Sequence, residues 1–135
     1  VLGYWFTNRI SAGAGPIFEY YRWSNYKANV LGARTFGRFQ AFNNLFNSGG
    51  NLFLHAQYDF LTYKDNYQYK DKRVTAHRLP LGLGFSQPMG GVATFNLMVL
   101  YDALYNKNRN SDIPLYNYGY VFDGFIIQGG INFGF

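Results

Sequence analysis

The chain has 135 residues, enough for one domain, and only 14% of them are charged, with a net charge of +5. The mean hydropathy of −0.20 and the lack of any apolar run near the roughly 20 residues of a spanning helix exclude a helical membrane protein. The absence of cysteine excludes a disulfide framework and a thiolate metal site. Aromatic residues make up 21% of the chain. The hydrophobic residues are therefore numerous, but they are spread along the chain instead of forming one long apolar run.

Seven stretches are predicted to be β-strands because apolar and small or polar residues alternate along them with a period of two. In chain order they are residues 1–7, 10–25, 29–42, 51–63, 75–87, 92–105 and 124–135. No stretch shows helical periodicity over a useful length, and no domain boundary is visible. We therefore expect a single all-β domain over residues 1–135.

The connections between these strands alternate in character. The turns at residues 8–9, 47–50 and 88–91 are short and rich in Gly or Asn, whereas segments 64–73 and 106–123 are long, charged and rich in Tyr. Outer-membrane barrels combine short periplasmic turns with longer external loops, and their strands cross with about 9–11 residues. The pattern predicts a transmembrane antiparallel up-and-down β-barrel in the outer membrane of a Gram-negative cell.

The number of strands predicts one more strand before residue 1. If the turn at residues 8–9 is periplasmic, the first and last predicted strands run in the same direction, toward the periplasm. Bacterial single-chain barrels have an even number of strands and both termini in the periplasm. We therefore expect eight strands, with the first lying ahead of this chain, which begins without Met as a processed or partial product would.

The polar strand faces would point into the barrel. They carry Glu19, Arg34, Arg38, His55, Gln57, Asp59, Arg78, Asn96, Asp102, Gln128 and Asn132. An eight-stranded barrel is just wide enough for side chains to fill it, and buried charges are tolerated only when paired. We expect a hydrogen-bonded plug whose network contains Glu19, Arg34, Arg38, His55, Asp59, Arg78 and Asp102. The alternative is a narrow pore or a small-solute site, and the balance of acid and base there argues against strong ion selectivity.

Catalytic chemistry finds little support in the sequence. His55 and Asp59 lie four residues apart on one strand face, about 13 Å along it, which is too far for a direct hydrogen bond. The chain has two His and no Cys, a poor set for a metal, and no G-x-S-x-G elbow. We expect no enzyme activity, metal or cofactor. A lipid-modifying barrel enzyme would need a nucleophile and a base at hydrogen-bond distance.

The aromatic and basic residues have expected positions of their own. Tyr and Trp side chains cluster near predicted strand ends, as in the girdles at membrane interfaces. A basic patch is predicted in loop 64–73 from Lys64, Lys70, Lys72 and Arg73, with Lys107 and Arg109 in the next long loop. These charges are either solvated or contact anionic lipid headgroups or an acidic partner surface. Their place in loops argues against a nucleic-acid partner.

A soluble ligand-binding barrel of the lipocalin type is the rival fold, because its strands alternate in the same way. Such a barrel should cover its outer face with Lys and Glu. The polar strand faces here carry mostly Gly, Ser, Asn and Gln with a few ion pairs, and the remaining charge lies in loops.

Several segments resemble the small outer-membrane β-barrel proteins common in Bacteroidota, namely residues 2–15, 51–58, 83–91, 99–105 and 130–135. The resemblance implies an eight-stranded barrel in which a further strand precedes residue 1. It also implies that Ile131, Phe133 and Phe135 form the C-terminal signal that the barrel assembly machinery recognises during insertion.

The function expected from the sequence is that of a plugged barrel with a structural or accessory role. It would stabilise the membrane or join a larger outer-membrane complex through its lipid-facing wall or its loops. The expected partners are outer-membrane lipids or lipopolysaccharide and another outer-membrane protein.

Overall fold

The computed structural model of the chain describes residues 2–23, 26–45, 47, 49–65, 72–110 and 124–133. Within them it contains eight strands and one short helix. Apart from β5, strands that follow one another along the chain lie next to one another in the sheet. The elements are β1 (Leu2–Trp5), β2 (Ile10–Trp23), β3 (Tyr26–Leu45), β4 (Gly50–Asp65), β5 (Lys72–Arg78), β6 (Pro80–Gly90), β7 (Ala93–Asp102), α1 (Tyr105–Asn110) and β8 (Phe125–Phe133).

The sheet is antiparallel throughout and runs up and down, as predicted. Its order is β1-β2-β3-β4-β6-β7-β8, and β5 pairs with β4 as well. The first part of β4 pairs with β6 and the last part pairs with β5. β5 and β6 therefore follow a single course across the sheet that is interrupted at Leu79, which is why one predicted strand, residues 75–87, appears as two.

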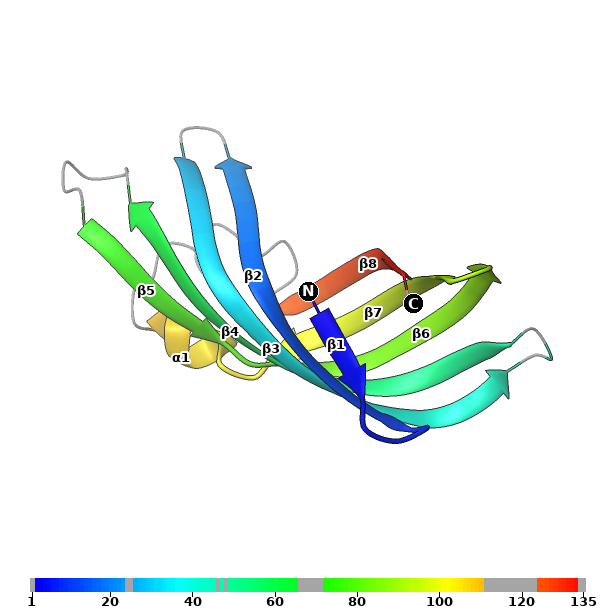
Figure 1. The fold of residues 1–135 in the computed structure, drawn as a ribbon. Helices are drawn as coiled ribbons and strands as arrows, with labels where there is room; N and C mark the ends of the chain where they lie inside the picture. The colour runs from blue at the N-terminus through cyan, green and yellow to red at the C-terminus, as the bar shows by residue number, and fades with distance from the viewer. Residues whose placement is uncertain are drawn as a thin grey trace.

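The sheet is strongly curved but not closed. Figure 1 shows it as a deep trough, with the short β1 on one side and β8 on the other. Among the described residues, β1 pairs with β2 alone and β8 with β7 alone, so the main path of the sheet begins and ends at these two strands, while β5 pairs with β4 alone. The predicted closed barrel is thus found only as a curved up-and-down sheet, and the further strand before residue 1 stays a prediction.

Several predicted strand ends differ from the structure. The strand predicted at residues 29–42 spans Tyr26–Leu45, and β6 continues to Gly90, into the turn predicted at residues 88–91. The loop predicted at residues 64–73 is shorter, because the β4–β5 ladder continues through the pairs Lys64–Arg73 and Asp65–Lys72. The strand predicted to end at Tyr105 ends at Asp102, and Tyr105 begins α1. A helix of six residues is too short to show a periodic pattern. The predicted turn at residues 47–50 is confirmed, with Asn47 and Gly49 at positive φ.

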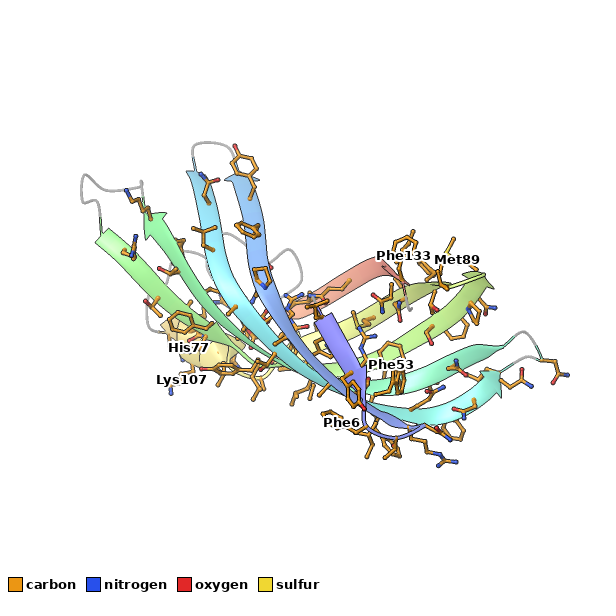
Figure 2. All side chains as sticks on the ribbon, in the orientation of Figure 1. Phe6, Phe53, His77, Met89, Lys107 and Phe133 are labelled. Atoms are coloured by element: carbon orange, nitrogen blue, oxygen red, sulfur yellow. The ribbon has the colours of Figure 1, made fainter. Side chains whose placement is uncertain are left out.

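The two faces of the sheet differ sharply in burial. The inner face is the side of β4 that carries Phe53, His55, Gln57 and Asp59, all of which are buried, and the outer face is the opposite side. In Figure 2 the ring of Phe53 lies in the hollow of the trough. Large apolar side chains are exposed along the outer face, among them Phe18, Leu31, Phe39, Leu54, Phe60, Leu81, Leu83, Leu97, Val99, Phe125 and Ile127.

The inner face has an apolar cluster toward each end of its polar centre. One contains Ile17, Val30, Leu61, Tyr63, Ala76 and the helical Tyr105. The other contains Phe53, Met98 and Leu100. The ring of Phe53 lies against the backbone of Gly84, where a Cβ atom would come within 2.3 Å of it. Burial of these side chains contributes roughly 25 cal/mol per Å² of apolar surface.

Two strand glycines offer a matched test of this packing. A Cβ atom on Gly82 would lie 2.1 Å from the backbone oxygen of Val99, whereas one on Gly37 would meet nothing within 4 Å. Gly82→Ala is expected to destabilise the fold by about 1–3 kcal/mol through overpacking against backbone. Gly37→Ala should be neutral or stabilising by about 0.5 kcal/mol. Urea unfolding measures both, and equal effects of the two changes would contradict the register in which β6 and β7 pair.

Candidate functional site

The polar centre of the inner face is built around Asp59, which is 0% exposed. The ladder places Arg34 of β3 directly opposite Asp59 on one side and Arg78 of β5 opposite it on the other. Arg34 donates from Nε to Oδ1 at 2.8 Å and from Nη2 to Oδ2 at 3.0 Å. Arg78 donates from Nη2 to Oδ2 at 2.9 Å. A buried carboxylate thus lies between two guanidiniums, with the bidentate geometry that makes such pairs strong.

Glu19 extends this cluster to a fourth strand, β2. Arg78 Nη2 lies 2.7 Å from Glu19 Oε1, and Arg34 Nη2 lies 3.9 Å from the same oxygen. The Glu19 side chain is 24% exposed, so water still reaches it. Two carboxylates and two guanidiniums therefore compensate each other across four strands, which meets the condition for burying charge.

A second part of the network runs along β4 from Asp59. Gln57 Nε2 donates to Asp59 Oδ2 at 2.9 Å, and Gln57 Oε1 lies 3.1 Å from His55 Nε2. Arg38 Nε donates to His55 Nδ1 at 3.2 Å. Since a guanidinium can only donate, His55 Nδ1 must be an acceptor, and the neutral ring then carries its proton on Nε2. All the hydrogen bonds consequently point one way, from Arg38 through His55 and Gln57 to Asp59.

Arg38 is held by aromatic rings rather than by a carboxylate. Its guanidinium carbon lies 5.0 Å from the ring centroid of Phe36 and 4.8 Å from that of Phe53, within the range of cation–π attraction. Nη2 also lies 3.8 Å from the sulfur of Met98. The four ion pairs between described residues do not include Arg38, so the rings stabilise this charge within the described part of the face.

The structure brings together six of the seven residues predicted for the polar network and gives the seventh a different role. Asp102 is 0% exposed, but its Oδ1 accepts hydrogen bonds from the backbone N–H of Leu79, at 2.9 Å, and of Leu104, at 3.0 Å. Asp102 therefore connects two backbone segments: Leu79, between β5 and β6, and Leu104, between β7 and α1.

The residues predicted for assembly and for the basic patch lie in several places. Ile131 and Phe133 are exposed on β8, and Phe135 lies outside the described residues. Lys64 belongs to β4, while Lys72 and Arg73 belong to β5, so the prediction of a loop was wrong for these three. Lys70 lies outside the described residues. Lys107 and Arg109, predicted in a loop, lie on α1.

The site has features that sequence reasoning missed. The expected separation of His55 and Asp59 is consistent with the structure, but Gln57 connects them, and the shared face of residues 55, 57 and 59 was the available signal. The cation–π contacts of Arg38 depend on rotamers, for which the sequence gives no signal. Within the described ranges, no group of three or more His, Cys, Asp or Glu side chains could hold a metal ion. No described helix is long and apolar enough to span a bilayer.

The arrangement is suited to filling the concave inner side of the sheet with polar side chains whose charges are paired. Most of its donors and acceptors bond to one another, and the described groups nearest the centre, Gln57, Asp59 and Arg78, are at most 4% exposed. Comparisons with protein-family models, with curated proteins and with solved structures found no match to the chain.

Proposed function

We propose that the protein is an outer-membrane β-barrel with a plugged polar interior, acting as a structural or accessory subunit of a larger outer-membrane complex. The observation that carries the proposal is the inverted pattern of the two faces. The buried face holds the ion pairs of Arg34, Asp59 and Arg78, while Leu and Phe side chains cover the exposed face. Such exposure is costly in water and favourable against lipid.

The length of the apolar band supports a membrane location. On the outer face of β4 the band runs from Leu52 to Phe60, and the exposed cation Lys64 follows it. A tilted spanning strand needs about 9–11 residues, which this interval matches. A water-soluble barrel of the lipocalin type would need polar side chains at these positions, so the rival fold is disfavoured.

Closure of the barrel is part of the proposal. β5 and β6 occupy one strand position in such a barrel, because they follow a single course beside β4. The described sheet therefore supplies seven strand positions, the first at β1 and the last at β8. One further strand between these edges gives an even number and removes both edges from lipid, where unpaired backbone groups are costly. The resemblance to small Bacteroidota barrels leads to the same arrangement, with both termini in the periplasm.

Alkaline carbonate extraction tests the membrane location. We expect the protein to stay in the membrane pellet, because its outer face is apolar around the sheet, and to migrate faster on gels before boiling than after. The control is a periplasmic protein released by the same wash. Recovery of the chain in the supernatant would refute the proposal and favour a soluble barrel.

Planar-bilayer conductance separates the plug from its alternative, a narrow pore or small-solute barrel. With Asp59 and its partners filling the inner face, we expect no steady conductance from the reconstituted protein. A conductance of constant size that changes in Arg34→Gln would favour the pore. A mild-detergent pull-down then tests the accessory role, which predicts a stoichiometric complex and is contradicted by recovery of the barrel alone.

A further inference from the structure

The outer face of the β4–β5 hairpin carries two cations directly opposite each other. Lys64 pairs with Arg73 in the antiparallel ladder, and both side chains are exposed. Facing residues in such a ladder have Cβ atoms about 5 Å apart, and like charges there destabilise the pair. The ion pairs between described residues lie on the inner face and include neither cation. The pair is thus a place where an anion would relieve repulsion.

The residues next to this cation pair change steadily in character along the hairpin. Thr75 follows on the same face of β5, and then His77 pairs with Phe60 of β4. The hydroxyl of Tyr58 lies 2.6 Å from His77 Nδ1. Asn108 of α1 donates from Nδ2 to the backbone oxygen of His77 at 2.6 Å, and Figure 2 shows where His77 and α1 lie. The hairpin therefore passes from cations through hydroxyl and aromatic groups to the apolar band that continues with Leu54.

The same change of character occurs on the neighbouring strands. Tyr20 of β2 pairs with Asn29 of β3, and both are exposed on the outer face. One step further along, Phe18 pairs with Leu31, and both are exposed apolar side chains. The cation pair lies at this same boundary between polar and apolar rows. A ligand that fits it must carry an anionic group and an apolar chain together.

We propose that Lys64 and Arg73 bind the phosphate monoester headgroup of a membrane lipid, with its acyl chains along Phe60 and Leu54. A phosphate accepts from a guanidinium in bidentate fashion and from an ammonium at the same time, so one headgroup can neutralise both cations. Thr75, one step from the cation pair on the same face, then lies beside the linkage between headgroup and chains, and the Tyr58–His77 pair lies beside the chains. The inference rests on the proposed membrane location. An acidic peptide would leave the adjoining apolar band uncovered, which favours the lipid.

The test counts lipids retained by the purified protein. The protein is reconstituted in nanodiscs of phosphatidylcholine with a minor fraction of phosphatidic acid, then released into mild detergent for native mass spectrometry. We expect phosphatidic acid to be retained in preference to phosphatidylcholine. Lys64→Gln and Arg73→Gln should each lower this retention about fivefold, the usual contribution of one cation at a membrane surface.

Two further variants guard against loss of the fold. Arg9→Gln removes an exposed cation near the β1–β2 connection, where Arg9 O accepts from Gln40 N, and should leave retention unchanged. Lys64→Glu converts the facing cations into an opposite-charge pair, so the hairpin should be at least as stable. Retention should nevertheless fall at least as far in Lys64→Glu as in Lys64→Gln.

The possible failures are distinguishable. Equal retention of both lipids by a carbonate-resistant protein would overturn the lipid site and leave the membrane location standing. Release of the protein by carbonate would overturn both. Unchanged lipid retention in Lys64→Gln, together with loss of a co-purifying acidic protein, would overturn the lipid site in favour of a protein-binding surface.

Discussion

Replacing Asp59 with asparagine is expected to destabilise the folded protein by about 3–5 kcal/mol, the usual effect of removing one partner from a buried ion pair. Asp59 is 0% exposed and accepts from Arg34, Arg78 and Gln57. Asparagine keeps the shape but leaves two guanidiniums without a compensating charge at that point. Urea unfolding of the reconstituted protein, followed by tryptophan fluorescence, measures the loss.

Glu19→Gln is the matched control for this change. It removes the same charge from the same cluster, but the Glu19 side chain is 24% exposed, so water can solvate the arginines left behind. We expect a loss of about 1 kcal/mol. A combined variant with Glu19→Gln, Arg34→Met, Asp59→Leu and Arg78→Met removes all four charges and should lose less than Asp59→Asn alone. A larger loss in the combined variant would contradict the role of Asp59 as a charge partner.

If the proposed membrane location holds, replacing Leu54 with arginine is expected to destabilise the protein by about 2–4 kcal/mol, the range for a cation near the bilayer midplane of a β-barrel. Leu54 is 48% exposed on the outer face of β4, within the apolar band. A guanidinium there would be drawn into hydrocarbon unless the strand shifts. Unfolding of the protein in lipid vesicles measures the effect.

The control for Leu54→Arg is Asn43→Arg, at an exposed position near the end of β3. Close to the membrane boundary the same cation should change stability by about 0–1 kcal/mol. A soluble barrel predicts the reverse pattern, in which Leu54→Arg leaves stability unchanged and improves solubility. That result would argue against lipid as the environment of the outer face.

Much of the sheet could be predicted because strand alternation is a local property of the sequence. Leu31, Ala33 and Phe39 fall on one face and Arg34 and Arg38 on the other, and the burial of β3 follows that division. The turn containing Asn47 and Gly49 was also predictable, since these residues tolerate positive φ.

The strand ends and the detailed site were less predictable because they depend on contacts between distant residues. The β4–β5 ladder continues through Lys64 and Arg73, two polar residues that look like loop in isolation. Tyr105 lies outside the strands and joins the apolar cluster that contains Leu61 and Val30, which are far from it in the sequence. The sharing of Asp59 between Arg34 and Arg78 could be expected as pairing, but its geometry required the register of three strands.

The ion-pair network also bears on the order in which the chain assembles. Glu19, Arg34, Asp59 and Arg78 come from β2, β3, β4 and β5, which are consecutive along the chain and joined as hairpins. Their charges can be matched within this unit before β6, β7 and β8 have paired. In the proposed barrel these four side chains would then enter the bilayer as paired charges, before the later strands join. Within the proposed barrel, the four hairpin-connected strands β2 to β5 therefore form a unit whose ion pairs do not depend on the C-terminal strands.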